Sequence, residues 1–260
     1  MLMKSPHCLR LVAALVLTMN AHAQTASAPL PAQKYKFTLN FEVETQYLLH
    51  LPQDYAATNG RRWPLMLFLH GAGERGSDVQ SVGVHGPMNL VKQGTNFPFI
   101  IVAPQCPDNQ RWHKELLLPF LDHIVTTLAV DTNRVYLTGL SMGGYGTWDL
   151  GTGHPEKFAA IAPICGGGSV LDVLLAGYGR PSNPVAALPV WAFHGAKDSV
   201  VPLEESERMI GAMKKAGAKE ARLTVYPEAD HNSWTETYDN PEFYRWLLSH
   251  ALTDSTRVKK

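Results

Sequence analysis

Short, uninterrupted runs of apolar residues recur along this chain and constrain its fold more than any other feature. Each run is four to six residues long, which suits a strand better than a helix. Strands buried on both faces of a sheet require such continuous runs, whereas half-exposed strands alternate apolar and polar residues. Six runs of this kind are present, at 65–69, 99–103, 135–138, 159–164, 190–193 and 223–226.

Helical segments are expected between these strands, at 115–128, 142–153, 203–216 and 241–252, with another around 87–93. Residues 35–43 and 47–51 add two strands, which makes eight. Alternating strands and helices predict an α/β fold with a mostly parallel eight-stranded sheet flanked by helices. The longest irregular stretches, 74–98 and 166–189, fall short of the ~50 residues of a small domain, so no large cap is expected.

The first 23 residues are typical of a signal peptide. Lys4 and Arg10 precede the apolar segment 11–19, and Ala21-His22-Ala23 forms a small-x-small cleavage site. The apolar segment is about half the ~20 residues of a membrane span, so export to the periplasm or medium is expected rather than stable membrane insertion. A short anchor or a buried helix is the alternative. Residues 24–34 are interpreted as a flexible leader, 35–253 as the main domain and 254–260 as a tail.

Charge and cysteine content narrow the possible partners. The 23 basic and 23 acidic residues balance without the basic patch of a nucleic-acid-binding protein, so no nucleic-acid partner is expected. Cleavage after Ala23 removes Cys8 and leaves Cys106 and Cys165. An oxidising compartment permits a disulfide between them, although two separate buried thiols are the favoured interpretation. No Cys/His spacing typical of a metal site occurs, and the sequence assigns no oligomeric state.

The pentapeptide Gly139-Leu140-Ser141-Met142-Gly143 is the strongest candidate for a chemical site. Gly-x-Ser-x-Gly is a weak signal alone, but here it directly follows the strand 135–138 and directly precedes the helix 142–153. This strand–turn–helix context is that of a nucleophile elbow, in which a strained turn projects the serine hydroxyl above the sheet. Ser141 is therefore predicted to be a nucleophile.

A serine hydroxyl needs a base to remove its proton, and the base needs an acid to orient it. In this strand–turn–helix setting the expected chain order is Ser, Asp or Glu, then His. Asp198 and His231 follow the strands 190–193 and 223–226, at the carboxyl edge where open α/β sheets place their sites. Asp230 is the rival for the acid. His70 and His194, each followed by glycine, are expected to shape loops.

The chemistry also needs backbone donors for an oxyanion. The amide of Met142, at the positive end of the helix 142–153, is one candidate. The second is expected in the loop after the strand 65–69, with Ala72 preferred over Gly71 and Gly73. Alternatively, this loop is only a tight turn and donates no hydrogen bond to an oxyanion.

Several motifs together resemble a known group. They are His70-Gly71-Ala72-Gly73-Glu74, Ala103-Pro104-Gln105-Cys106-Pro107 with Trp112, the extended serine motif 139–146, and Pro163-Ile164-Cys165-Gly166-Gly167-Gly168. They resemble α/β-hydrolases described as predicted peptidases or phospholipase/carboxylesterase-like esterases, which are similar to feruloyl and acetylxylan esterases and to polyhydroxybutyrate depolymerase-like proteins.

This resemblance implies an α/β-hydrolase fold and hydrolysis of a small-molecule or polymer-linked ester without a cofactor. It also implies that Gln105 and Trp112 lie near the acyl or alcohol pocket, although a Trp112 ring that covers the core is equally compatible with the sequence. A peptidase or amidase with the same triad, and a non-catalytic binding protein on the same scaffold, are the competing hypotheses.

Overall fold

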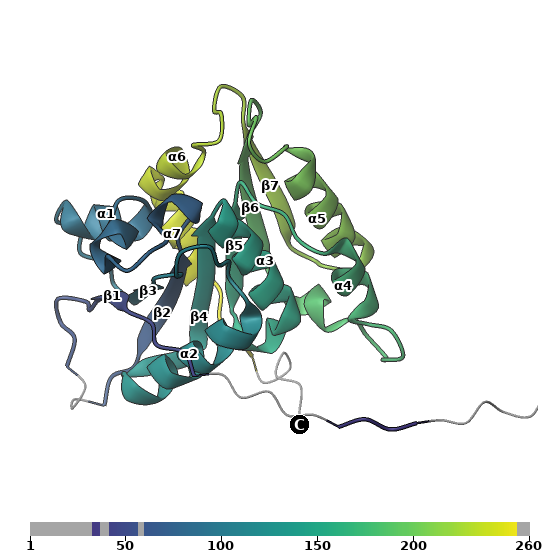
Figure 1. The fold of residues 1–260 in the computed structure, drawn as a ribbon, viewed down its shortest axis with the longest axis horizontal. Coiled ribbons are helices and arrows are strands. Elements are labelled where there is room, and N and C mark those ends of the chain that lie inside the picture. Colours follow the sequence, from purple (N-terminus) through teal and green to yellow (C-terminus); the bar gives the residue numbers. More distant parts are fainter. Residues whose placement is uncertain (1–32, 37–41, 57–59, 254–260) are drawn as a thin grey trace, which may run out of the picture. The chain divides into compact units, whose positions relative to one another are not determined.

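A seven-stranded sheet runs through the computed structural model, which describes residues 33–36, 42–56 and 60–253 (Figure 1). The strands have the spatial order β1-β3-β2-β4-β5-β6-β7, and all neighbours are parallel except β1 with β3. All helices and strands described here belong to one compact unit, Glu42–Lys260. The strands are β1 (Tyr47–His50), β2 (Trp63–Leu69), β3 (Ile100–Pro104), β4 (Val130–Leu140), β5 (Ala160–Ile164), β6 (Val190–Gly195) and β7 (Ala221–Tyr226).

Strand β2 illustrates why the apolar runs are continuous. Leu65, Leu67 and Leu69 pack in the core on one face of the sheet, whereas Met66 and Phe68 pack in the core on the other face. All five side chains are fully buried. A strand with helices on both faces has no exposed face, so polar residues have no position along it.

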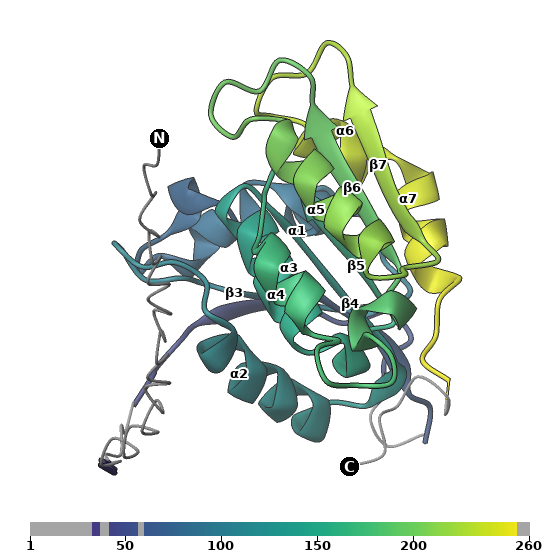
Figure 2. The same cartoon turned by 90° about the vertical axis from the view of Figure 1, so that its right-hand side faces the viewer.

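Two helical layers provide this cover (Figure 2). The layer on the first face consists of α2 (Lys114–Thr127), α3 (Met142–Gly153), α4 (Val170–Leu175) and α5 (Glu204–Lys215). The layer on the second consists of α1 (Gly86–Lys92), α6 (Trp234–Asp239) and α7 (Pro241–Leu248). The described residues contain no helix long and apolar enough to cross a membrane.

The predicted α/β fold is confirmed, but the prediction of eight strands is not. The described part of the chain has seven strands. The remaining expected strand, 35–43, includes residues 37–41, which lie outside the described residues, and its described residues are not in a strand. The predicted segments 1–23 and 254–260, and nearly all of 24–34, also lie outside them. No cap is present in the described part of the chain.

Most of the predicted helices have bounds close to those expected. Helix α3 has the predicted bounds, and α1, α2 and α5 begin and end within one residue of theirs. The last helix ends at Leu248 rather than 252, with Ser249 as its C-cap residue. Two six-residue helices, α4 and α6, were not predicted. Ser169 caps α4 with its side chain, and such a short helix has too few turns to show a periodic pattern.

Candidate active site

Ser141 occupies a sharp turn between β4 and α3. Its φ of 52° lies in a region that residues other than glycine rarely adopt. Gly139 and Gly143 make the turn possible: a Cβ at Gly143 would lie 1.9 Å from the carbonyl oxygen of Leu69, and one at Gly139 would lie 2.5 Å from that of Gly143. Only glycine fits at either position. The amide of Ser141 donates to Ile164 on β5, which anchors the strained residue at 3.0 Å.

The structure brings the three predicted side chains together. Oγ of Ser141 lies 2.9 Å from Nε2 of His231, and Nδ1 of His231 lies 2.8 Å from Oδ2 of Asp198. Because the ionised carboxylate only accepts, Nδ1 carries the proton, and Nε2 is left to accept from the serine hydroxyl. The Asp198 side chain is fully buried and that of His231 is 20% exposed, so this Asp–His pair meets solvent only through the histidine.

The Asp198 carboxylate is held on both oxygens. Oδ1 accepts the amides of Val200 and Val201, each at 2.9 Å. Burial tends to raise the pKa of Asp198, but the hydrogen bonds from His231, Val201 and Val200 outweigh burial and lower the pKa below its usual value. The carboxylate therefore stays ionised at neutral pH and can orient His231. The rival Asp230 is exposed, and its carboxylate accepts the amide of Asn232 within a turn.

The predicted oxyanion donors lie at the ends of neighbouring strands. Ala72 begins a short 3-10 helix, Ala72–Glu74, soon after β2, and Met142 is the first residue of α3 after β4. Strands β2 and β4 pair in parallel with Leu69 opposite Gly139, so the two turns start side by side. Neither amide donates to another group in the described part of the chain. Both remain available to a ligand, and that of Met142 lies at the positive end of a helix dipole.

Glu74 orients the loop that carries Ala72, and sequence reasoning did not assign it this role. Its buried carboxylate accepts the amide of Gly71 at 2.9 Å. Arg75 next to it donates to the carbonyl oxygens of Ala72 and Gln110. The signal that could have identified Glu74 is its position three residues after Gly71, which is typical of a capping box.

His70 holds the same loop from the strand side. Nδ1 donates to the carbonyl oxygen of Gly71 at 2.6 Å, and Nε2 accepts the amide of Cys106 at 2.9 Å. This pattern fixes a neutral ring, and burial lowers the pKa of His70 to about 4. His70 therefore joins the ends of β2 and β3, the loop-shaping role expected for it.

Gln105 and Trp112, the two residues expected near the substrate, differ in position. The Gln105 amide is buried and donates to the carbonyl oxygens of Glu74 and Asp78 and to the Ser81 hydroxyl. It does not line the cleft that contains Ser141. Trp112 does line that cleft, and its indole N–H donates to the carbonyl oxygen of His70 at 3.0 Å. Trp112 thus both anchors the start of the loop that carries Ala72 and borders the cleft.

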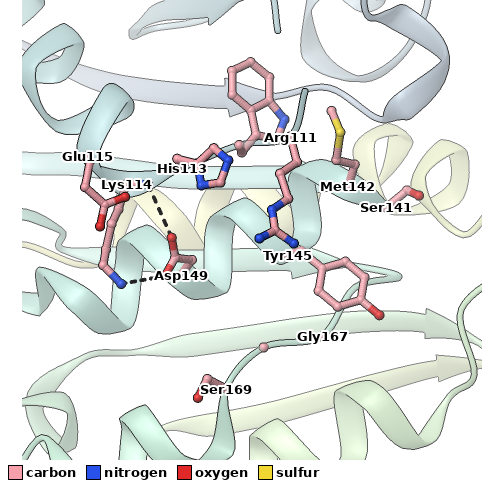
Figure 3. Close-up of a pocket in the computed structure, with 12 residues that line it drawn as sticks. Arg111, His113, Lys114, Glu115, Ser141, Met142, Tyr145, Asp149, Gly167 and Ser169 are labelled. Carbon is pink, nitrogen blue, oxygen red and sulfur yellow. Dashed lines mark hydrogen bonds and ion pairs between the residues drawn. The ribbon is translucent and has the colours of Figure 1, made fainter. Parts of the chain in front are cut away.

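A cleft of about 650 Å³ extends from Ser141 along α3 (Figure 3). Asp149, at its far end, lies eight residues further along the chain from Ser141, which corresponds to about 12 Å of helix. Lys114 and Asp149 pair at 2.8 Å there. Trp112 and Tyr145 supply aromatic walls, and Arg111 borders the cleft without an ion pair or hydrogen bond to another described residue. The remaining lining residues are His113, Glu115, Met142, Gly167, Gly168 and Ser169.

Cys106 and Cys165 are free and buried. Cys165 lies close to the relay. Its Sγ is within 4.8 Å of a carboxylate oxygen of Asp198 and a ring nitrogen of His231, a spacing that could hold a metal ion. Burial raises the pKa of the Cys165 thiol to about 12. The side chains of Asp198 and His231 are already hydrogen-bonded to each other at 2.8 Å. The arrangement therefore suits a hydrogen-bonded relay better than a metal site.

The sheet order, the strained serine turn and the carboxyl-edge site together define the α/β-hydrolase class. Residues 109–243 match the model of the dienelactone hydrolase family, and this chain belongs to that family. The match includes all three residues of the relay.

Known proteins similar to this chain are named as esterases or related hydrolases. A putative carboxymethylenebutenolidase of Salmonella typhimurium is 33% identical over 138 residues, covering 50% of this chain and 47% of the relative. A probable feruloyl esterase C of Aspergillus niger is 25% identical over 202 residues, covering 74% and 69%. The crystal structure of a thermostable esterase, 33% identical, superposes with a TM-score of 0.66 over 81% of this chain and 60% of that one. The chain thus spans about half the length of the Salmonella relative.

Proposed function

We propose that this protein is an exported serine esterase that hydrolyses carboxylic esters through an acyl-enzyme intermediate. The main support for this proposal is the continuous hydrogen-bonded relay of three side chains. Ser141 Oγ lies 2.9 Å from Nε2 of His231, and Nδ1 of His231 lies 2.8 Å from Oδ2 of Asp198. Attack of Oγ on the ester carbonyl transfers the serine proton to Nε2 of His231. Asp198 stabilises the resulting imidazolium, and His231 then gives the proton to the leaving alcohol.

The amides of Ala72 and Met142 are the proposed donors to the oxyanion of the tetrahedral intermediate. Water then attacks the acyl-enzyme, with His231 again as base, and releases the acid and Ser141. Residues 1–23 are proposed to direct export, which would suit esters on small molecules or on extracellular polymers. The cleft of about 650 Å³ is larger than an acetyl group requires, which favours esters with an extended acyl or alcohol part along α3.

Purified wild-type protein and the Ser141→Ala variant test this proposal with p-nitrophenyl acetate. The wild type should hydrolyse the ester, and the variant should lose about 10³-fold or more of kcat, because the nucleophile is gone. Unchanged hydrolysis by Ser141→Ala would refute the assignment. Matched ester and amide substrates, including methyl ferulate and feruloyl amide, separate an esterase from a peptidase or amidase. Faster cleavage of the amide would overturn the esterase proposal while keeping the triad.

A further inference from the structure

A second histidine, His194, lies against the triad carboxylate. It is on β6, and its side chain is fully buried. Its Nε2 lies 2.9 Å from the carbonyl oxygen of Val201 and 3.3 Å from Oδ2 of Asp198. Because a carbonyl oxygen only accepts, Nε2 must carry a proton. The positive end of this N–H therefore lies beside the same oxygen that accepts from Nδ1 of His231.

The other nitrogen of the ring fixes its orientation. Nδ1 lies 2.7 Å from Oγ of Ser206 on α5, and Ser206 Oγ lies 3.2 Å from the carbonyl oxygen of Gly166. Gly166 directly precedes Gly167 and Gly168, which line the cleft. Held at both nitrogens, the His194 ring has a single orientation, and it connects the turn of the triad acid to α5 and to the wall of the cleft.

His194 acts on both oxygens of the carboxylate. Val201 accepts from His194 through its carbonyl oxygen and donates through its amide to Oδ1 of Asp198, so the ring fixes the turn that holds Oδ1. At Oδ2 the ring places a positive dipole in a dry site, where the low dielectric strengthens the attraction. Without this N–H the Val201 carbonyl loses its partner and Oδ2 retains only His231.

We propose that His194 is a positioning residue of the catalytic relay, which holds Asp198 so that Oδ2 faces Nδ1 of His231. The inference rests on the proposed serine hydrolase function. His194 does not line the cleft, so its loss should lower kcat and leave KM unchanged. Removal of a hydrogen bond that supports a charged group predicts a loss of about 10- to 100-fold in kcat.

Two amide substitutions of similar chemistry separate positioning from simple packing. Glutamine can place an N–H where Nε2 of His194 lies, whereas the shorter asparagine reaches only the position of Nδ1. His194→Gln should therefore react at close to the wild-type rate, and His194→Asn should be slowed by about 10- to 100-fold. Phosphonylation of Ser141 by a fluorophosphonate probe measures this rate independently of ester specificity, and thermal unfolding checks that each variant is folded.

The outcomes distinguish the two proposals. If the wild type is not labelled, the serine hydrolase proposal fails. If the wild type is labelled and His194→Asn reacts equally fast, or if both variants are equally slow, the positioning role of His194 is wrong. Should His194→Asn not fold, proton NMR of His194→Gln decides. The low-field signal of the His231 Nδ1–H should persist but change position, since an amide now lies beside the same oxygen, and an unchanged signal overturns the inference.

Discussion

Replacement of Glu74 offers a direct test of how the loop that carries Ala72, a proposed oxyanion donor, is held. In Glu74→Ala the buried amide of Gly71 loses its acceptor, which lies at 2.9 Å in the native protein. An unsatisfied buried amide costs about 1–3 kcal/mol of unfolding free energy. At roughly 2–4 °C per kcal/mol for a chain of this size, the melting temperature should fall by about 2–12 °C.

Catalysis should suffer more than stability in this variant. Complete loss of one oxyanion donor costs about 10²- to 10³-fold in kcat, and Glu74 orients the loop of Ala72 without itself being the donor. We therefore expect a loss of about 10- to 100-fold in kcat for p-nitrophenyl acetate. KM should change little, because Glu74 does not line the cleft.

Glu74→Gln is the matched control for this prediction. The amide of glutamine has nearly the same shape, and its carbonyl oxygen can accept the same N–H, so kcat should stay within about threefold of the wild type. Steady-state kinetics and thermal unfolding of both variants provide the measurement. A folded Glu74→Ala variant with wild-type kcat, or a Glu74→Gln variant as impaired as Glu74→Ala, would refute the reasoning.

Three further predictions concern charge and burial. Burial keeps the His70 ring neutral in the native protein and lowers its pKa to about 4. Between pH 6.5 and 4 the unfolded chain therefore binds a proton at His70 that the native protein does not bind. Stability should therefore fall by roughly 3 kcal/mol as pH falls from 6.5 to about 4. Urea unfolding should show a smaller decrease for His70→Gln, and an equal decrease contradicts the prediction. Arg111→Gln should lower kcat/KM about two- to fivefold at low salt for the mono-p-nitrophenyl ester of succinate, since an exposed cation contributes little. It should not affect p-nitrophenyl acetate, and equal effects on both esters count against a charge contact. The thiols of Cys106 and Cys165, whose pKa values burial raises to about 11 and about 12, should react with Ellman's reagent at pH 8 only after unfolding; rapid reaction in the native protein would contradict their burial.

The fold could be predicted largely because its main signals are local. An apolar run such as 65–69 reports burial on both faces of a sheet whatever its neighbours are, and α3 has both the length and the flanking turn that define it. Helices α4 and α6 could not be found in this way. Each has six residues, and α4 buries only Val173, so it depends on the Ser169 cap and on packing rather than on periodicity.

In the candidate site, too, some features could be predicted from the sequence and others could not. Asp198 and His231 could be found from the order of the strands, because β6 and β7 are neighbours with Gly195 opposite Tyr226, and the residues that follow them must meet at one edge. The direction of a side chain does not follow from strand order. Gln105 follows β3 at the same edge, yet its amide is directed to the carbonyl oxygens of Glu74 and Asp78, away from the cleft.

The same reasoning explains why the partners of His194 were beyond prediction. Its loop-shaping role could be expected from the glycine that follows it, but Ser206 lies on a helix twelve residues later and Gly166 lies two residues after the end of β5. Their meeting depends on the packing of α5 against β6, which no local pattern encodes. Strand order thus brings the candidate site residues to one edge of the sheet, whereas long-range packing sets the orientation of their side chains. The variants His194→Asn and Glu74→Ala should therefore slow the chemical step while leaving the fold and substrate binding largely intact.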